Sequence, residues 1–337
     1  MSARVVHLVT RLNVGGIARF LQQGRDAVPL LLRGRVEGGE REVEWGGAQV
    51  VLPSLHRRVH PIDDGRALAD LVRALRRLRP DLLHTHASKA GALGRVAARL
   101  LGIRCVHTFH GHVLSGYFPA ALSALATRIE RLLASSCRLT ATGPSTAADL
   151  ARRLGRPVEV LAPGIALPPP AAGARERWRR SLGNPDLVAL CVGRAAAVKD
   201  MARFVDAARA AGFLPVVAGA VAVPGALALG HVEAMQDLHA AVDVLVCASR
   251  AEGTPYAVLE GMWSGLPVVS TPVGDVAWML GGAGAVTEDL AAALARLRDP
   301  ELRRAWGAAG AQRVRVEFPA PALAPRLREL YERTLRG

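Results

Sequence analysis

The chain has 337 residues, half of them hydrophobic, which is enough for two domains of about 150 residues each. No run reaches the roughly 18 consecutive apolar residues of a membrane-spanning helix, and the first residues lead directly into an apolar strand without the pattern of a signal peptide. We therefore expect a cytoplasmic protein. The four cysteines are widely spaced, which disfavours a disulfide framework or a CxxC metal site and predicts buried free thiols.

The formal net charge of +14 is concentrated in the first half of the chain. Residues 1–168 contain 24 basic and 12 acidic side chains, whereas residues 169–337 contain 19 and 17. Only Lys89 and Lys199 are lysines, so codon bias toward arginine contributes to the high pI of 11.1. The asymmetry still predicts an anionic partner for the first half: nucleic acid, a membrane surface or a phosphorylated substrate.

Strands and helices are predicted to alternate through the first half of the chain. Apolar patterns indicate strands at 5–10, 28–32, 49–52, 80–86, 104–107, 138–142 and 158–161, and helices from about residue 17 and at 66–79, 87–101, 119–134 and 147–154. This alternation is typical of a parallel sheet covered on both faces. The basic face of the helix at 66–79 could be solvated or could lie on an anionic membrane.

Two features of this half suggest ligand contacts. Gly15 and Gly16 separate the first strand from the first helix, where glycines let the backbone approach a ligand, although a plain tight turn has the same composition. Five of the ten histidines lie at 84–112, close to predicted strand ends.

The histidine spacing permits more than one interpretation. His84 and His86 lie on one face of a strand, as a zinc site allows, but no cysteine or carboxylate of matching spacing joins them. Packing explains His84, His86 and His107 better than a metal does. His110 precedes a glycine at a strand exit and is the best candidate for an exposed functional imidazole.

A linker and a second alternating unit follow. Residues 163–173 are rich in proline, glycine and alanine, as expected between domains. Strands are then predicted at 187–192, 214–218, 227–230, 242–248 and 267–270, and helices at 201–211, 255–264, 290–298, 300–314 and 321–336. Arg194 and Lys199 bracket the loop after the first of these strands, where two cations could neutralise a diphosphate.

The segment 249–260 joins an apolar strand to a short helix. We expect Thr254 as the N-cap and Pro255 as the first helical residue. Free N–H groups and the positive end of the helix dipole would bind a phosphate or sugar hydroxyls. Glu252 and Glu260 could accept hydrogen bonds from ligand hydroxyls, or they could simply be acidic residues of a surface helix.

In this order and spacing, these motifs resemble those of the family-4 retaining glycosyltransferases, which have the GT-B fold. They are RLNVGG at 11–16, PDLLHTHASKAG at 80–91, TFHGH at 108–112, VGR at 192–194 with Lys199-Asp200, and Glu252 and Glu260 around Gly253-Thr254-Pro255. The resemblance is to the branch that builds bacterial capsular or cell-surface polysaccharides. It implies an α/β fold of two Rossmann-like parallel-sheet domains facing across a cleft. The domains would be 1–168 on the acceptor side, 169–319 for the nucleotide-sugar, and a helix at 320–337 that packs back on the first.

The resemblance also implies roles for the matching residues. His110, Glu252, Arg194 and Lys199 would be catalytic, the two cations stabilising the leaving nucleoside diphosphate. Gly15, Gly16, Gly253, Thr254, Pro255 and Glu260 would bind the donor, with Glu260 on its ribose. Lys89 and His112 would lie on the acceptor side.

The expected activity is transfer of a sugar, with retention, from a nucleotide-sugar, a UDP-sugar being favoured, to a saccharide or lipid-linked acceptor. The family needs no metal and the chain has no Asp-x-Asp motif, so we expect no cofactor. A GT-B nucleotide-sugar epimerase is disfavoured by the glutamate pair with Arg194 and Lys199. A basic nucleic-acid-binding protein is disfavoured because only 4% of residues are aromatic and no stacking platform is evident. The basic first half would face anionic lipid, as a peripheral contact at the inner face of the cell membrane, or a pyrophosphate-linked acceptor.

Overall fold

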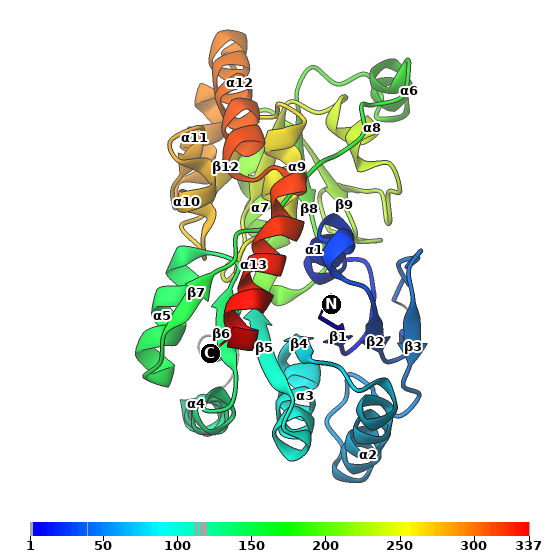
Figure 1. Cartoon of the computed structure of the whole chain (residues 1–337). Helices are drawn as coiled ribbons and strands as arrows, with labels where there is room; N and C mark the ends of the chain where they lie inside the picture. The colour runs from blue at the N-terminus through cyan, green and yellow to red at the C-terminus, as the bar shows by residue number, and fades with distance from the viewer. Residues whose placement is uncertain (1–2, 39, 112–113, 115–119, 337) are drawn as a thin grey trace. The chain divides into compact units, whose positions relative to one another are not determined.

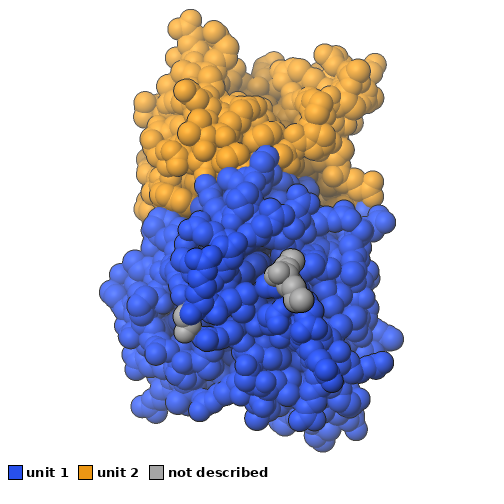
Figure 2. Space-filling model, viewed as in Figure 1, with its two compact units in different colours: residues 1–164, 320–337 blue, residues 165–319 orange. Residues whose placement is uncertain are grey.

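The computed structural model describes residues 3–38, 40–111, 114 and 120–336. They divide into two compact units, one formed by residues 1–164 and 320–337 and the other by residues 165–319 (Figures 1 and 2). No helix in the described part of the chain combines the length and the apolar character needed to cross a bilayer. Each unit is built on one parallel sheet with helices, which confirms the predicted fold class.

The first unit contains a seven-stranded sheet in the order β3-β2-β1-β4-β5-β6-β7, with every pair parallel. Its strands are β1 (Val5–Val9), β2 (Leu31–Arg33), β3 (Gln49–Val51), β4 (Leu82–His86), β5 (Arg104–Phe109), β6 (Arg138–Ala141) and β7 (Val158–Val160). Its helices are α1 (Gly16–Gln23), α2 (Pro61–Leu78), α3 (Ser88–Leu101), α4 (Ala120–Ala134), α5 (Pro144–Leu154) and α13 (Leu323–Arg336), with short 3-10 turns η1 (Arg25–Ala27) and η3 (Ala320–Ala322). All residues of β1 and β4 are buried, as central strands of a covered sheet should be.

Helix α3 lies very close to this sheet because two of its residues are glycines. A Cβ added to Gly94 would lie 2.5 Å from the Thr85 side chain, and one added to Gly91 would overlap the His107 ring. Helix α3 also holds α4 through the fully buried Arg95, whose guanidinium donates to both carboxylate oxygens of Glu130 at 2.7 and 3.0 Å. A charge buried this deeply needs such a partner.

Helix α2 begins five residues earlier than the sequence pattern indicates. Pro61 occupies its first turn, where the missing N–H costs nothing, and Asp63 and Asp64 follow at the positive end of the helix dipole. The apolar periodicity starts only after these residues, so an apolar pattern alone does not show that they belong to the helix.

The C-terminal helix α13 packs on the first unit, as expected for a helix that returns to it (Figure 1). Leu327 and Leu323 pack against Gly24 after α1, and Arg328 donates to the Asp26 carbonyl at 2.9 Å. Tyr331 is almost fully buried against β1 and β4.

The second unit has a six-stranded parallel sheet in the order β10-β9-β8-β11-β12-β13. Its strands are β8 (Val188–Val192), β9 (Leu214–Ala218), β10 (Leu227–Ala228), β11 (Val244–Cys247), β12 (Val268–Ser270) and β13 (Ala285–Val286). Its helices are α6 (Ala174–Ser181), α7 (Met201–Ala210), α8 (Met235–His239), α9 (Tyr256–Trp263), α10 (Val276–Leu280), α11 (Leu290–Arg296) and α12 (Pro300–Glu317), with a 3-10 turn η2 (Ala197–Lys199). Helices α6, α8 and α10 and strand β13 were not predicted.

Candidate active site

The order of strands in the second unit reverses between β8 and β11. From β8 the chain continues to β9 and β10 on one side, and from β11 it continues to β12 and β13 on the other. Loops that leave the carboxyl ends of two such strands diverge, and ligands bind in the crevice between them. The loop after β8 carries Arg194 and Lys199, and the loop after β11 carries Glu252 to Pro255.

An ion pair joins these two loops. Lys199 Nζ donates to Glu252 Oε1 at 2.6 Å, and the Ser249 hydroxyl donates to the same oxygen at 2.7 Å. Burial disfavours the charged form of Lys199, but the Glu252 carboxylate outweighs this effect and raises the pKa of the lysine. Lys199 is therefore a cation at neutral pH, and its side chain keeps 25% of its surface exposed.

Glycine provides the space for this lysine. A Cβ on Gly193, the residue after β8, would lie 3.0 Å from Cε of Lys199, so the lysine stem packs directly over the backbone there. Arg194, the next residue, is exposed, and among the described residues no ion pair holds its guanidinium. Two cations thus flank the start of this loop, one fixed and one extended into solvent.

A second connection fixes the same loops. Arg250 Nε donates to Asp200 Oδ2 at 2.8 Å, and the Arg250 backbone N–H donates to the Val198 carbonyl at 2.8 Å. The hydrogen bond from Arg250 also lowers the pKa of Asp200. The positions of Lys199 and Glu252 are thereby set by backbone as well as by side-chain contacts.

The loop after β12 packs against the backbone of Glu252 and Gly253. The sequence analysis did not identify this loop as part of the site. Gly274 has φ +51°, and any Cβ there would overlap the carbonyl oxygens of Glu252 and Gly253. The Asp275 N–H donates to the Gly253 carbonyl at 2.9 Å, and the Asp275 side chain is fully buried. The available signal was a Val-Gly-Asp sequence shortly after a predicted strand, the same kind of junction that drew attention to Gly193.

Helix α9 begins one residue later than expected. Pro255 is its N-cap, with extended backbone and no side-chain capping bond, so the assignment of Thr254 as N-cap was wrong. The chain enters α9 through Ser249–Pro255, a loop already fixed by its contacts with Val198 and Asp275, which shifts the cap to the proline. Glu260 lies in the middle of α9 and is only 6% exposed.

The first unit has its own reversal of strand order, between β1 and β4. Gly15 and Gly16 are exposed at the start of α1, after the loop that follows β1, and apart from its chain neighbours no described atom lies within 4 Å of a Cβ placed on Gly15. The backbone here is open to a ligand. Lys89, by contrast, forms an ion pair with Asp64 and donates to the Arg58 carbonyl, so its charge is compensated within this unit.

His110 follows β5 and is half-buried. Its Nε2 lies 3.0 Å from His86 Nδ1, and the edge of Phe20 packs against its ring at 4.9 Å between centroids. Burial lowers the pKa of His110 to about 3, so the ring is neutral at physiological pH. His112, the other expected acceptor-side residue, lies outside the described residues.

His84 and His86 are fully buried and packed against each other, and the structure adds His7 of β1 to this group. His107 is also buried, but its ring lies against Thr85 and Gly91. Ring nitrogens of His7, His84 and His86 lie within 4.8 Å of one another, a geometry that could hold a metal ion. Each of these nitrogens already has a hydrogen-bond partner among the described residues.

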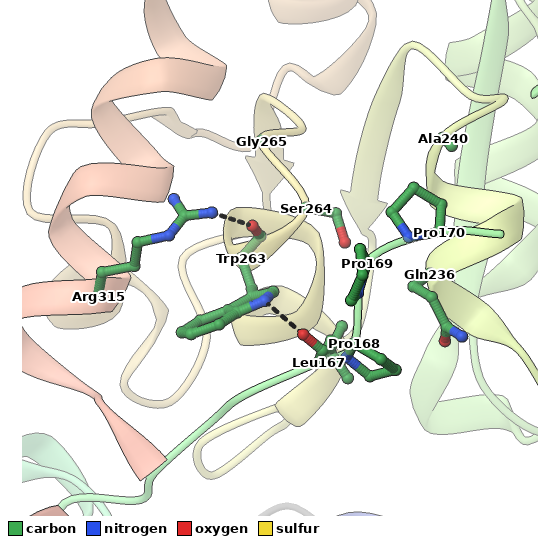
Figure 3. Close-up of a pocket in the computed structure, with 10 residues that line it drawn as sticks. All are labelled: Leu167, Pro168, Pro169, Pro170, Gln236, Ala240, Trp263, Ser264, Gly265 and Arg315. Atoms are coloured by element: carbon green, nitrogen blue, oxygen red, sulfur yellow. Dashed lines mark hydrogen bonds between the residues drawn. The ribbon is translucent and has the colours of Figure 1, made fainter. Parts of the chain in front are cut away.

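A hollow on the surface of the second unit lies away from these loops. It measures about 430 Å³ and sits where residues 167–170 cross the end of α9 (Figure 3). Trp263 donates from Nε1 to the Leu167 carbonyl at 3.1 Å, and the Arg315 guanidinium lies over the Trp263 ring at 5.1 Å. Trp263 precedes the amino end of β12, so this hollow lies at the amino ends of the strands, opposite to Lys199 and Glu252. The contact of Trp263 with Leu167 holds the first residues of the unit in place.

Comparisons with known proteins agree with this architecture. A family model described as Glycosyltransferase Family 4 matches residues 16–168, and one described as Glycosyl transferases group 1 matches residues 186–299. Sucrose-phosphate synthase from Thermosynechococcus elongatus has a TM-score of 0.84 at 18% identity, covering 98% of this chain and 99% of that one. HepE from Anabaena, solved with UDP-glucose, has a TM-score of 0.81 at 17% identity, covering 98% and 100%. At these identities the likeness shows a shared fold.

Two curated relatives match parts of the sequence. The Escherichia coli UDP-Gal:alpha-D-GlcNAc-diphosphoundecaprenol alpha-1,3-galactosyltransferase is 48% identical over 61 residues, 18% of this chain and 16% of that protein. The D-inositol 3-phosphate glycosyltransferase of Thermomonospora curvata is 29% identical over 308 residues, 74% of this chain and 71% of that protein. The aligned part thus spans about a sixth of the first relative and most of the second.

Proposed function

We propose that the chain is a family-4 glycosyltransferase of the GT-B type, because two glycosyltransferase family models match residues 16–168 and 186–299. In this proposal it transfers a sugar from a nucleotide-sugar, a UDP-sugar by preference, to a saccharide or lipid-linked acceptor with retention of configuration. The observation that carries this proposal is the Lys199–Glu252 ion pair, which bridges the loops after β8 and β11 where the strand order reverses. A ligand placed there meets a fixed cation and a carboxylate at one point.

In this proposal different residues bind different parts of the donor. Lys199 and the exposed Arg194 neutralise the leaving diphosphate, which removes the need for a bound metal. Glu252 and the backbone of 253–255 hold the transferred sugar, and Glu260 accepts hydrogen bonds from the ribose. The complex of HepE with UDP-glucose supports a UDP-sugar donor.

The acceptor side is proposed to be the first unit. His110 offers a neutral imidazole after β5, and Gly15 and Gly16, proposed to bind the donor, offer open backbone at the start of α1 to its diphosphate or to the acceptor. The name of the Escherichia coli relative, which includes a diphosphoundecaprenol acceptor, supports a lipid-linked diphosphate and a role in surface polysaccharide synthesis.

The donor proposal predicts a nucleotide-dependent gain in stability. A ligand that binds only the folded state at 100 times its Kd stabilises by about 2.7 kcal/mol. We expect one of UDP, GDP, ADP or TDP, or its sugar, to raise the melting temperature of the wild type but not of Glu260→Ala. Differential scanning fluorimetry with this panel measures the effect.

The matched control is Glu301→Ala, which removes an exposed carboxylate from α12 of the same unit. It should respond like the wild type. If no nucleotide stabilises the wild type while DNA binds it in a salt-sensitive way, the nucleic-acid alternative replaces our proposal. An equal response of Glu260→Ala would remove this residue from the site.

We also propose that the first unit touches an anionic membrane. Helix α4 exposes four apolar side chains at spacings of three and four residues, which places them on one face: Leu122, Leu125, Ile129 and Leu132, between 46% and 72% exposed. Arg128 and Arg131 interrupt the stripe with positive charge. Apolar and basic residues on one helix are typical of interfacial helices.

The membrane contact predicts that Leu125→Glu combined with Leu132→Glu weakens vesicle binding by about tenfold or more, because two partly inserted leucines are lost. Sedimentation with vesicles of mixed anionic and zwitterionic lipid measures this. Val316→Glu is the control, since Val316 is 68% exposed on α12. Substitution of Arg73, Arg76 and Arg77 on α2 tests whether that basic face takes part; unchanged binding of all variants would exclude a membrane-binding first unit.

A further inference from the structure

An unbroken series of hydrogen bonds, here called the polar chain, crosses the sheet of the first unit. Its first part joins His110 Nε2 to His86 Nδ1 (3.0 Å), His86 Nε2 to His7 Nδ1 (3.1 Å) and His7 Nε2 to Tyr331 Oη (2.9 Å). From Tyr331 Oη it continues to His84 Nδ1 (2.8 Å), and from His84 Nε2 to Thr108 Oγ1 (2.6 Å). It ends with the bonds from Thr108 Oγ1 to Thr140 Oγ1 (2.6 Å) and from Thr140 Oγ1 to the His107 carbonyl (3.4 Å). Its members come from β1, β4, β5, β6 and α13. Only its His110 end is more than marginally exposed.

The His107 carbonyl at the end of the polar chain decides which atom of each hydrogen bond is the donor and which is the acceptor. The His107 carbonyl can only accept, so Thr140 donates to it and must accept from Thr108. Thr108 then accepts from His84 Nε2–H, which leaves His84 Nδ1 to accept from the Tyr331 hydroxyl.

The same rule carries the direction to His110. Tyr331, having donated its proton, accepts from His7 Nε2–H, and His7 Nδ1 accepts from His86 Nε2–H. His86 Nδ1 then accepts from His110 Nε2–H, so Nδ1 of His110 carries the lone pair.

This argument requires neutral rings and a protonated phenol, and burial provides both. Burial lowers the pKa of His7 to about 3, against a smaller opposing effect of the Ala27 backbone, and lowers the pKa values of His84 and His86 well below the usual value. Burial raises the pKa of Tyr331. A metal at His7, His84 and His86 would have to take lone pairs that these rings use to accept from His86, Tyr331 and His110.

We propose that the polar chain fixes His110 as its Nε2–H tautomer and thereby presents Nδ1 as a hydrogen-bond acceptor, with Tyr331 as the positioning residue. Given the proposed function, the donor to this nitrogen is the incoming hydroxyl of the sugar acceptor. A ring whose protonated form is this unfavourable orients the hydroxyl and does not keep its proton.

Tyr331 is critical because, among the described groups, its hydroxyl alone links His84 to His7 in the polar chain: it donates to His84 Nδ1 and accepts from His7 Nε2. Without its hydroxyl, the three rings of His7, His86 and His110 lose contact with the His107 carbonyl through the chain. The reversed arrangement, with Nδ1–H at each of the three rings, then becomes accessible. His110 would in part present a donor where the wild type presents an acceptor.

Long-range ¹H–¹⁵N correlation spectra of ¹⁵N-histidine-labelled full-length protein report the tautomer of each ring. We expect Nε2–H at His110 in the wild type and a mixture of tautomers in Tyr331→Phe. The control is Thr334→Val, which removes another buried hydroxyl of α13, one that donates only to the Leu330 carbonyl of its own helix at 2.7 Å. If Tyr331→Phe does not fold, Thr108→Val breaks the polar chain at a near-isosteric position and carries the same expectation.

Three results would overturn the proposal: Nδ1–H at His110 in the wild type, an unchanged Nε2–H tautomer in both chain variants, or stoichiometric zinc in the purified protein with shifted His7, His84 and His86 resonances. The kinetic expectation is a five- to tenfold lower kcat for Tyr331→Phe with an unchanged KM for the donor. Mixed tautomers with an unchanged kcat would remove the role in orienting the acceptor. Absence of transfer by the wild type would contradict the proposed function and leave the tautomer result standing.

Discussion

Lys199→Met is expected to lower kcat for sugar transfer by roughly 10²–10³-fold, the usual effect of losing one charge-stabilising donor in an active site. The KM for the donor should change only a few-fold. The reason is that negative charge on the diphosphate grows as the bond to the sugar breaks, and Lys199 is the cation that the structure holds rigidly between β8 and β11. Steady-state kinetics with the nucleotide-sugar identified by thermal stabilisation measure the effect.

The ion pair with Glu252 makes a structural explanation possible, and a double-mutant cycle separates it from catalysis. Lys199→Met leaves a carboxylate that is only 14% exposed with the Ser249 hydroxyl as its remaining partner, so some stability is lost. Glu252→Gln in addition removes the unpaired charge. The double variant should therefore regain melting temperature and stay inactive; recovery of kcat together with stability would show that the pair only holds the two loops.

The same unit contains a matched control. Arg179 and Asp243 also form a 2.6 Å ion pair, with side chains 14% and 11% exposed, but Asp243 precedes β11 and so lies at the opposite edge of the sheet. Arg179→Met should lower the melting temperature and leave kcat unchanged. An equal loss of kcat in this variant would mean that activity follows the stability of the unit, whichever pair is removed.

The parallel sheets could be predicted because several strands, such as β8 and β11, are continuous apolar runs, and the junction motifs could be found because glycines and charges follow those runs. All residues of β11 and four of the five of β8 are buried, and this is the property that the apolar pattern reports. The order of the strands, and hence the reversals at β1/β4 and β8/β11, could not be predicted, because pairing is decided between segments distant in the chain.

Helix α6 escaped prediction because it has few apolar residues. Its sequence is ARERWRRS, in which only Ala174 and Trp178 are apolar. It is held by polar contacts instead: the Arg175 guanidinium donates to the Ala240 carbonyl at 2.7 Å, and the Ala171 N–H just before the helix donates to Asp237 at 2.8 Å. Tertiary hydrogen bonds of this kind leave no periodic signal in the sequence.

Within the site, local motifs identified Lys199 and Glu252, but distant partners were hidden. His7 sits inside an apolar strand and Tyr331 inside an amphipathic helix, so neither stands out in its own segment. Their hydrogen bond joins residues 324 positions apart. Only the return of α13 to the first unit shows that the histidines of β1 and β4 share one phenol.

The buried histidines predict a steep loss of stability in mild acid, independent of any ligand. His7, His84, His86, His107 and His110 all have a pKa lowered by burial, whereas in the unfolded chain each titrates near 6.5. Their contribution is therefore fully present above pH 6.5 and is lost as the pH falls toward the folded-state values, because only the unfolded chain takes up protons there. At one pH unit below 6.5, each neutral ring lowers the free energy of unfolding by about 1.4 kcal/mol. The free energy of unfolding of the first unit should therefore fall by about 5–7 kcal/mol between pH 7.5 and 5.5.

Urea titration at both pH values, followed by hydrogen exchange in peptides that contain β1 and β4, measures this for the first unit alone. His107→Gln should reduce the number of protons taken up on unfolding by about one, since the His107 ring is buried against Thr85 and lies outside the polar chain. His60→Gln, which removes an exposed imidazole before α2, is the control for loss of a histidine outside the buried group. A free energy of unfolding that stays constant from pH 7.5 to 5.5 would mean that these rings bind protons in the folded state, and the neutral polar chain could not then exist as described.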